Sequence, residues 1–370
     1  MIAPGATIGI LGGGQLGRML ALAAAPLGYR CHIFSPEPGG PAAQVSAAET
    51  VAAYDDGAAL DAFGAAVDVV TTEFENVPAS ALERLAERVP VRPDARSLRV
   101  AQNRIAEKEF VRGLGLETTP YAAIEVGADN AAADARIGRP AVLKTQTLGY
   151  DGKGQVVLTQ GDDLLVAWRD TLGGRPAILE AFAPIEREVS AIVTRTQDGR
   201  VACFDPVENR HVNGILDVTL APADIAPALA QAARDGAERI AQALDHVGVL
   251  CVELFVTEDG RLLVNEIAPR VHNSGHWTIE GCETSQFAQH VRAVCGLPLG
   301  STARRANACM KNLIGADVER WPVLAADPAA HLHLYGKADA RIGRKMGHVT
   351  WLSPLGTPPS EPDWPPGGAA

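Results

Sequence analysis

The chain has 370 residues, of which 47% are hydrophobic, and a formal net charge of -11. This length predicts about two or three domains with substantial cores. The acidic balance argues against a nucleic-acid-binding protein, because binding to the phosphate backbone needs basic surface. We expect no membrane span and no secretory signal, since the apolar runs are short and the N-terminus lacks a basic segment. Six cysteines without C-x-x-C spacing indicate free thiols in a cytoplasmic protein.

The first part of the chain alternates between short apolar strands and helices. Residues 6–11 predict a strand and residues 15–27 a helix, and the pattern G-x-G-x-x-G lies between them as Gly12, Gly14 and Gly17. Continued alternation to about residue 95 predicts a doubly wound parallel domain. A nicotinamide site is one interpretation of the glycine motif. The acid expected at the end of the second strand is replaced by Ser35-Pro36, however.

Polar residues follow a later strand of this domain. Glu73, Glu75 and Asn76 come after residues 67–71, at the edge where ligands bind in such sheets. Acids before a helix also stabilise its N-terminus. The sequence alone leaves both interpretations open.

A helix is predicted over residues 97–115, with a basic face that includes Arg104, Lys108 and Arg112. Such a face is usually solvated. Another helix is predicted over residues 128–137.

A glycine-rich loop joins two short strands in the middle of the chain. The first strand ends at Lys144, and the loop runs from Gly149 to Gln155. The unit is not a P-loop, because no helix follows and G-x-x-x-x-G-K-[ST] is absent. Its backbone amides can still surround a phosphate. A flexible hairpin turn is the alternative.

The next segments combine an acid with apolar strands. Residues 178–182 predict a strand with Glu180 near its end, a pattern that can hold an adenine and a ribose. Residues 205–211 are polar and rich in possible site residues, although a histidine such as His211 is more often structural. A long helix is predicted over residues 222–245.

Two apolar runs around Asp259-Gly260 predict an antiparallel hairpin. A two-residue loop would place Val256 opposite Leu263, Leu254 opposite Asn265, and Glu253 opposite Glu266. Facing carboxylates repel, and a divalent metal turns this repulsion into a binding site. A solvated hairpin face is the alternative. The polar run over residues 270–277 favours a ligand site.

After Gly300 we predict short strands over residues 308–314 and 331–335. A basic cluster, either solvated or anion-binding, follows at Lys337, Arg341, Arg344, Lys345 and His348. The Pro/Gly-rich tail is predicted to be disordered.

Together these motifs resemble the ATP-grasp ligases. The resemblance is closest to the N5-carboxyaminoimidazole ribonucleotide synthases, which carboxylate 5-aminoimidazole ribonucleotide (AIR) in purine synthesis. Three segments carry it, residues 12–19, 149–155 and 265–277. The resemblance implies an α/β fold: a Rossmann-like parallel domain, a small lid, an antiparallel ATP-grasp domain and a β-rich extension. The expected boundaries are 1–97, 98–180, 181–300 and 301–355, with a disordered tail over 356–370.

The resemblance also implies the site residues. For ATP these are Arg104, Lys144, Gly149, Tyr150, Asp151, Gly152, Lys153, Gly154, Gln155, Glu180, Ala181, Phe182, Ala183, Glu188, His211, Asn265 and Glu266. The metal, Mg²⁺ or alternatively Mn²⁺, would lie on Glu253 and Glu266. For AIR they are Gln15, Leu16, Glu73, Tyr150, Lys153, Arg270, His272, Asn273, Ser274, Lys337, Arg344 and Lys345. Catalytic roles would fall on Asp151, Lys153, Arg270 and Lys337.

The implied partners are small molecules, namely AIR, bicarbonate and MgATP, and enzymes of this family tend to be homodimers. Three alternatives are a different ATP-grasp ligase or a formate-using transformylase, a nicotinamide dehydrogenase, and a non-catalytic binding protein of the same fold.

Overall fold

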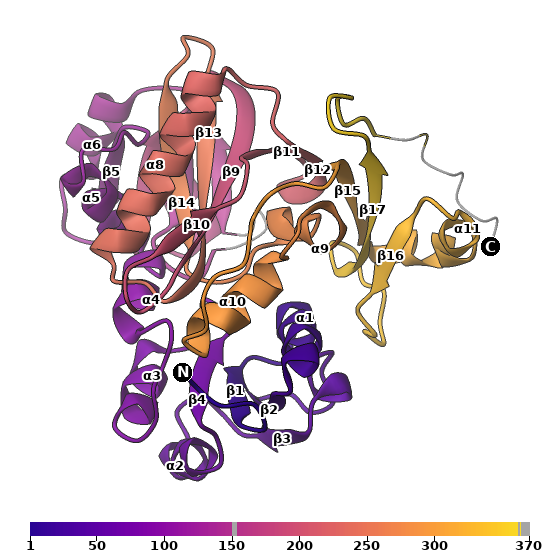
Figure 1. Ribbon diagram of the computed structural model, residues 1–370. Helices are drawn as coiled ribbons and strands as arrows, with labels where there is room; N and C mark the ends of the chain where they lie inside the picture. Colours follow the sequence, from indigo (N-terminus) through magenta and orange to yellow (C-terminus); the bar gives the residue numbers. More distant parts are fainter. Residues whose placement is uncertain (150–153, 362, 364–370) are drawn as a thin grey trace.

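The computed structural model describes residues 1–149, 154–361 and 363, and the strands in these residues form three sheets (Figure 1). The N-terminal sheet is parallel, in the order β3-β2-β1-β4. Its strands are β1 (Thr7–Leu11), β2 (Arg30–Ser35), β3 (Ala48–Val51) and β4 (Val69–Thr72). The helices of this domain are α1 (Gln15–Ala24), α2 (Gly57–Ala65) and α3 (Ala79–Ala86). The predicted doubly wound parallel domain is confirmed.

The prediction of a single helix over residues 97–115 is wrong. The structure has two helices, α4 (Ala95–Ala101) and α5 (Arg104–Gly113), separated by a break at Asn103. The Asn103 side chain accepts hydrogen bonds from the amides of Ile105 and Ala106, so it caps α5. The cap starts a new helix axis and directs the side chains of α5 toward the centre of the molecule.

The lid is an antiparallel sheet in the order β5-β8-β6-β7. Its strands are β5 (Tyr121–Ile124), β6 (Ala141–Thr145), β7 (Gln155–Leu158) and β8 (Ala177–Ala181). The helices α6 (Asn130–Ile137) and α7 (Leu164–Leu172) complete it, and Trp168 of α7 packs into its core with Leu143 and Leu179.

The largest sheet has nine strands and runs in the order β14-β13-β9-β11-β12-β15-β17-β16, with β10 paired to β9. The strands that form its first half are β9 (Ile185–Arg195), β10 (Val201–Cys203), β11 (Val207–Val212), β12 (Ile215–Ala221), β13 (Gly248–Thr257) and β14 (Leu262–Ala268). Helix α8 (Pro227–Ala243) covers one face of this half, where Ile240 packs in one core cluster with Val252 and Leu254 (Figure 1). The opposite face carries the polar residues described below.

The C-terminal strands belong to the same sheet, although the sequence suggested a separate small β subdomain. These are β15 (Asn307–Ile314), β16 (His331–Leu334) and β17 (Lys345–Ser353), and β15 pairs with β12 through Met310 and Thr219. Helices α9 (Thr278–Gly281), α10 (Gln286–Val294) and α11 (Trp321–Ala326) lie in this half of the chain. The described part of the predicted disordered tail contacts the sheet, because Thr357 accepts from Asn307 and Glu361 pairs with Lys311 at 3.0 Å.

The hairpin between β13 and β14 differs from the prediction in two places. Its loop has three residues, since the Thr257 amide donates to the Arg261 carbonyl and Gly260 has a φ of 78°. Leu254 therefore faces Val264, and Val256 faces Leu262. A β-bulge at Asn265 then shifts the register by one residue. The two differences cancel, so Glu253 faces Glu266 as predicted.

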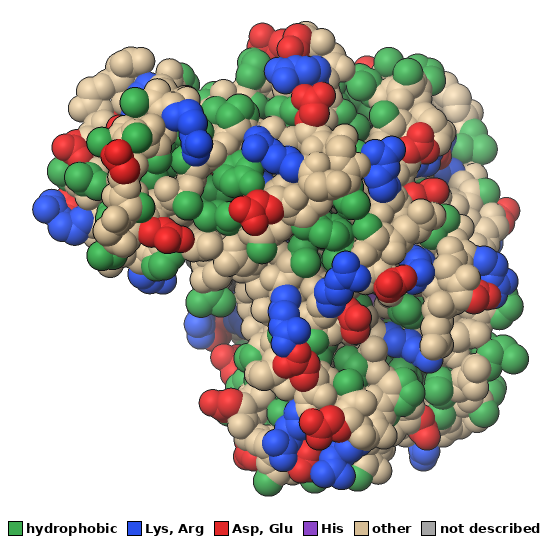
Figure 2. Space-filling model, turned by 90° about the vertical axis from the view of Figure 1, so that its left-hand side faces the viewer, with side chains coloured by type: hydrophobic (Ala, Val, Ile, Leu, Met, Phe, Trp, Pro, Cys, Tyr) green, Lys and Arg blue, Asp and Glu red, His purple; other side chains and the backbone are tan. Residues whose placement is uncertain are grey.

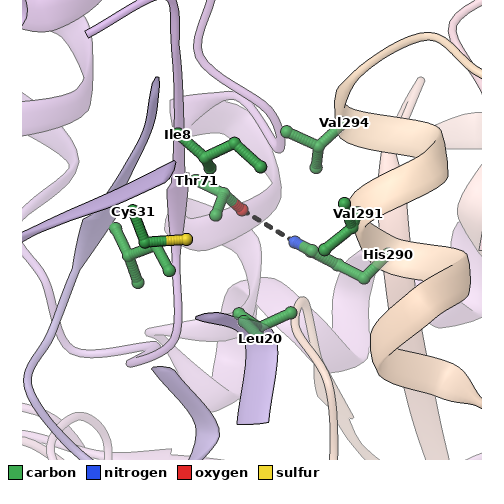
Figure 3. Close-up of a pocket in the computed structure, with 8 residues that line it drawn as sticks. Ile8, Leu20, Cys31, Thr71, His290, Val291 and Val294 are labelled. Atoms are coloured by element: carbon green, nitrogen blue, oxygen red, sulfur yellow. Dashed lines mark hydrogen bonds between the residues drawn. The ribbon is translucent and has the colours of Figure 1, made fainter. Parts of the chain in front are cut away.

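The N-terminal domain packs on α10 across a nearly closed interface (Figure 3). The His290 ring accepts from the Val249 amide through Nδ1, so its Nε2 donates to the Thr71 hydroxyl at 2.8 Å. The cavity beside it holds only about 10 Å³ and is lined mainly by aliphatic side chains. Dense packing therefore fixes the N-terminal domain against the large sheet.

The surface carries basic and acidic side chains that are intermixed on the face shown in Figure 2. No helix among the described residues is long and apolar enough to cross a membrane.

Candidate active site

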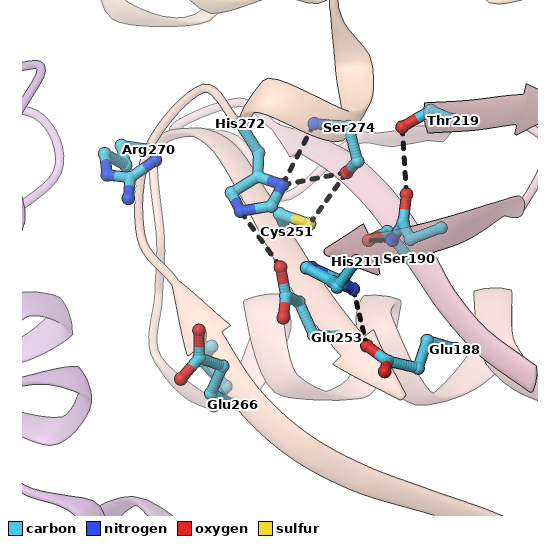
Figure 4. Close-up of polar contacts among 12 residues, drawn as sticks. Glu188, Ser190, His211, Thr219, Cys251, Glu253, Glu266, Arg270, His272 and Ser274 are labelled. Atoms are coloured by element: carbon cyan, nitrogen blue, oxygen red, sulfur yellow. Dashed lines mark hydrogen bonds and ion pairs between the residues drawn. The ribbon is translucent and has the colours of Figure 1, made fainter. Parts of the chain in front are cut away.

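The facing pair Glu253 and Glu266 lies on the exposed side of the β13–β14 hairpin, opposite the face that packs on α8. Figure 4 shows both carboxylates among His272, Arg270 and His211. The bulge explains why Glu266 points this way. Val264 packs in the core with α8, so strict alternation would also turn Glu266 into that core. The extra residue, Asn265, redirects Glu266 toward the site, and bulges commonly re-aim side chains in this manner.

Glu253 is held by a histidine from the loop after β14. His272 Nε2 lies 3.1 Å from Glu253 Oε1, and its Nδ1 is 2.8 Å from the Ser274 hydroxyl. Burial alone would raise the pKa of Glu253, but His272, His211 and Lys345 together lower it to about 2. Burial likewise opposes a charge on His272, while Cys251 and Glu253 outweigh it and raise its pKa. The Ser274 amide donates to His272 Nδ1 at 3.3 Å, so the ring donates to the Glu253 carboxylate through Nε2.

A row of polar side chains continues from this pair across the sheet. Glu188 on β9 lies 2.8 Å from His211 Nδ1 on β11. Beside them, Asn209 donates to Ser190 at 2.6 Å and accepts from Thr219 at 3.0 Å. The predicted residues Glu188 and His211 thus come together as expected. Burial lowers the pKa of His211, and the Glu188 carboxylate more than compensates and raises it.

Glu180, at the end of β8, is the centre of a buried charge cluster. Its Oε2 lies 3.1 Å from Lys144 Nζ, 3.5 Å from Lys108 Nζ and 3.1 Å from the Thr119 hydroxyl. Burial would raise the pKa of Glu180, but Lys144 and then Lys108 lower it to about 2. Its second oxygen, Oε1, is buried without a hydrogen-bond partner among the described residues. An atom of this kind can accept from a ligand in the cleft.

The sequence interpretation of a solvated basic face is wrong for Arg104 and Lys108 of α5, whereas Arg112 is exposed. Arg104 Nη1 lies 3.1 Å from Glu266 Oε2, and its Nη2 donates to the Gly149 carbonyl at 3.3 Å. Lys108 is 2% exposed, because the new helix axis that begins at Asn103 turns it inward. Arg104 and Lys144, both predicted to contact phosphates, therefore face the same cleft as Glu266 and Glu180.

A pocket of about 500 Å³ opens beside the predicted adenine segment. Ala181, Phe182 and Ala183 line it together with Leu263, which lies opposite Phe255 on the site face of the hairpin. Polar and charged side chains also line the pocket, namely Arg112, Glu117, Thr118 and Arg261, and its apolar part beside the strand end suits a flat heteroaromatic base. The predicted segment and the pocket therefore coincide.

The first glycine motif holds a carboxylate of the chain itself. Glu73, which follows β4, accepts from the amides of Gly14 at 2.8 Å and Gly17 at 3.1 Å. A Cβ atom on Gly12 would lie 2.6 Å from Glu73 Oε1. Gln15 begins α1 at this loop, but the Leu16 side chain is buried in the core. Because these amides already donate to Glu73, they are not free to bind the pyrophosphate of a nicotinamide cofactor.

Arg270 and the loop that follows it complete the site from the opposite side. Arg270 forms an ion pair with Glu75, the acid two residues after Glu73. Burial lowers the pKa of Arg270, and Glu75 overcompensates and raises it. Both side-chain amide atoms of Asn273 are buried without a partner among the described residues, and Ser274 is fully buried. The role of Glu75 as an ion-pair partner was left open by the sequence.

The C-terminal basic residues approach from a third side. Lys337 Nζ donates to the Lys345 carbonyl at 2.7 Å, and Arg344 donates to the Asp339 carbonyl at 3.1 Å. Lys345 contributes to the low pKa of Glu253 after the two histidines, so it lies near the facing carboxylates. Gln44, which the sequence did not single out, donates to the Gly336 carbonyl at 2.9 Å and ties this segment to the N-terminal domain.

Four predicted residues, Tyr150, Asp151, Gly152 and Lys153, lie outside the described residues. The flanking parts of the loop are placed: Gly154 has a φ of 72°, and Gln155 pairs with Lys144 across β6 and β7. Among the described residues, no group of three or more His, Cys, Asp or Glu side chains is arranged to hold a metal ion. A cation on Glu253 and Glu266 would take its further ligands from other oxygen donors, such as a bound phosphate.

The sequence analysis missed Glu107, and it placed Lys108 on a solvated face although its side chain is buried beside the site. Glu107 accepts from the Ile267 amide at 2.6 Å, and burial together with Glu266 raises its pKa to about 8. The available signal was the cap residue Asn103, which sets the rotation of the helix.

Comparison with known proteins places this arrangement in a family. An N5-carboxyaminoimidazole ribonucleotide synthase of Brucella melitensis biotype 1 is 52% identical over 352 residues, which cover 95% of this chain and 97% of the relative. The chain belongs to the N5-carboxyaminoimidazole ribonucleotide synthase family. Family models agree along the chain: a ribonucleotide synthetase preATP-grasp domain over residues 5–102, an ATP-grasp domain over 109–287, and a phosphoribosylaminoimidazole carboxylase C-terminal domain over 308–355.

Solved structures of N5-carboxyaminoimidazole ribonucleotide synthases have the same fold. An ADP complex of one such synthetase matches with a TM-score of 0.92 and 44% identity, over 95% of this chain and 94% of that one. The Aspergillus clavatus enzyme, in complex with ADP and 5-aminoimidazole ribonucleotide, matches with a TM-score of 0.88 and 34% identity over 94% of each chain. The predicted ATP-grasp fold is confirmed.

Proposed function

We propose that this protein carboxylates the 5-amino group of AIR in purine biosynthesis, using ATP and bicarbonate and releasing ADP and phosphate. The observation that carries the proposal is the pair of facing carboxylates, Glu253 and Glu266, with Arg104 paired to Glu266 and Arg270 on the loop after β14 (Figure 4). Lys144 adds a further positive charge beside Glu180. This combination suits a nucleoside triphosphate beside a second anionic substrate. The relative from Aspergillus clavatus holds ADP and AIR in the same fold.

In the first step, an oxygen of bicarbonate attacks the γ-phosphorus of ATP. The bond from that phosphorus to the β–γ bridging oxygen breaks, and ADP and carboxyphosphate form. Catalysis of such a transfer is mainly positioning and neutralisation of charge. Lys144 and Arg104 supply positive charge from the lid side, and Arg270 is fixed by Glu75 so that it can bind the bicarbonate oxygens.

In the second step, the amine of AIR attacks the carbonyl carbon of carboxyphosphate, or CO₂ released from it, and phosphate leaves. One proton leaves the amine. Asp151, together with Tyr150, is our candidate to place the amine or to accept this proton, and Lys153 is a candidate to bind the AIR phosphate or the carbonyl oxygens. We assign the AIR phosphate and ribose to Lys337, Arg344, Lys345, His272, Asn273 and the glycine-rich loop over residues 149–155. Asn273 supports this assignment, since its buried amide has no described partner and so can bind a ligand.

The residues also fit a divalent metal ion. Glu253 and Glu266 offer carboxylate oxygens in register, and the buried Asn265 Oδ1 next to Glu266 has no partner among the described residues. Oxygen donors of this kind suit Mg²⁺, with Mn²⁺ as the alternative. When bound, the ion would neutralise the phosphates of ATP. The free cysteines support a cytoplasmic location, and a homodimer is proposed from the tendency of the family.

The test is release of phosphate from ATP by the purified protein in the presence of Mg²⁺. It should require both AIR and bicarbonate, and label from bicarbonate should enter the product. Phosphate release with formate or with an amino acid in place of bicarbonate would contradict the proposal, as would an unlabelled product. Light scattering after size-exclusion chromatography tests the homodimer.

A further inference from the structure

Two consecutive charged side chains of α5 are buried against the strand that carries Glu266. Glu107 and Lys108 are each 2% exposed. Fully buried acids and lysines are rare unless they are paired or hydrogen-bonded. Both residues lie outside the sets assigned above to ATP, the metal ion or AIR, so their burial calls for an explanation from their contacts.

Those contacts fall on either side of Glu266. Glu107 Oε1 accepts from the Ile267 amide at 2.6 Å, and Lys108 Nζ lies 3.4 Å from the Asn265 carbonyl. Because β14 is the edge strand of the nine-stranded sheet, no further strand covers these backbone groups. Nearer the hairpin loop, the linker before β5 serves this purpose, since the Val264 amide donates to the Glu117 carbonyl at 2.8 Å.

These contacts lie at the β-bulge formed by Asn265. A bulge removes ladder hydrogen bonds, so the backbone there has more freedom than in a regular strand. Glu107 and Lys108 hold the residues immediately before and after Glu266, which the bulge turns toward the site. Lys108 also reaches Glu180 at 3.5 Å and the Thr119 hydroxyl at 3.4 Å, so one side chain links β14 to the end of β8.

We propose that Glu107 and Lys108 are positioning residues that fix the bulge, so that Asn265 and Glu266 both face the nucleotide. The proposal rests on the proposed MgATP site. It predicts that loss of either contact weakens MgATP binding selectively. The described side-chain contacts of Glu107 and Lys108 reach Ile267, Asn265, Thr119 and Glu180, none of which is assigned to AIR. If the two residues had a purely structural role, their loss would weaken the binding of both MgATP and AIR and would also destabilise the fold.

The experiment compares three variants of the full chain. Glu107→Gln keeps an oxygen that accepts from the Ile267 amide, Glu107→Leu removes it, and Glu109→Leu is the matched control at an exposed position of the same helix. Calorimetry gives the Kd for MgATP and, separately, for AIR. Hydrogen exchange of peptides covering β14, together with the thermal midpoint, reports on the bulge and on the fold.

Glu107→Leu should raise the Kd for MgATP at least tenfold and speed exchange in β14, while the Kd for AIR stays within twofold. Glu107→Gln and Glu109→Leu should resemble the wild type. If Glu107→Leu does not fold, Lys108→Met is measured in its place, with the same expected split. Unchanged MgATP affinity, an equal loss for both ligands, or a Gln variant as weak as the Leu variant would overturn the proposal.

Failure of the proposed function has a different signature. In that case the wild-type protein itself does not bind MgATP, whereas failure of the positioning proposal leaves wild-type binding intact and removes only the difference between the variants. Exchange in β14 is measured without any ligand, so it tests the contact between α5 and the bulge in either case.

Discussion

The Glu180 cluster permits a quantitative prediction, for the substitution Glu180→Gln. The pKa of Glu180 falls from its ordinary value of 4.5 to about 2, because Lys144 and Lys108 outweigh the cost of burial. A glutamine resembles the protonated acid, so the substitution should forfeit this difference. At about 1.4 kcal/mol for each pKa unit, the loss is about 3 kcal/mol of unfolding free energy at neutral pH. Two lysines also lose their nearest acid, which acts in the same direction.

The pH dependence gives the sign of the effect. Because the folded-state pKa is depressed, the stabilisation is fully present above about pH 4.5 and disappears as the pH falls through about 2. The difference between wild type and Glu180→Gln should therefore shrink from about 3 kcal/mol at neutral pH to about 1.4 kcal/mol near pH 3.

Urea denaturation at both pH values, followed by circular dichroism and tryptophan fluorescence, measures this difference; Trp168 reports on the lid core. The double variant Glu180→Gln/Lys108→Met should recover part of the loss, since it removes one buried unpaired charge. A cost below about 1 kcal/mol at neutral pH, or a cost that grows with acid, would refute the reasoning.

Three further predictions concern other parts of the molecule. Glu266→Gln should lower AIR-dependent phosphate release by at least about 100-fold, through loss of a charged oxygen ligand, whereas Glu258→Gln at the exposed hairpin tip should not; equal rates would contradict the metal assignment. Gly12→Ala should cost roughly 2–4 kcal/mol, because its Cβ would lie 2.6 Å from Glu73 at a φ of 114°, whereas Gly113→Ala has open space and should be neutral or stabilising by up to about 1 kcal/mol; thermal midpoints compare them. Burial lowers the pKa of His246 to about 4 and of His290 to about 3, so the unfolded chain binds more protons and the free energy of unfolding should fall as the pH drops from about 6.5 to 4; a flat urea midpoint over that range would count against this account.

Local patterns were enough to predict much of the site. Alternation of strands and helices gave the parallel domain, and hairpin symmetry brought Glu253 opposite Glu266. That result depended on two compensating differences, a longer loop and a bulge, and neither has a distinct sequence signature here. Side chains whose environment is set by helix rotation were missed. Lys108 looks like an ordinary surface lysine until the cap at Asn103 redirects α5.

Long-range packing decided the remaining differences. The pairing of β12 with β15 joins the C-terminal strands to the large sheet, and no local pattern shows this pairing because the two strands are about 90 residues apart. The same reason hid the contact between Gln44 and Gly336. The acid that fills the first glycine motif lies 59 residues from Gly14, beyond the reach of any local pattern.

The unbroken nine-stranded sheet has a mechanical consequence. Glu266 lies on its first strand, and the basic segment that contains Lys337 connects its last two strands. Both groups of residues are therefore attached to one continuous hydrogen-bonded sheet. A continuous sheet resists sliding of one strand past the next. The distance between Glu266 and the segment that contains Lys337 is therefore fixed by the strand pairing. Among the described residues, the lid strands β5-β8-β6-β7 form a sheet of their own, so a rotation of the lid would leave the ladder of the large sheet intact.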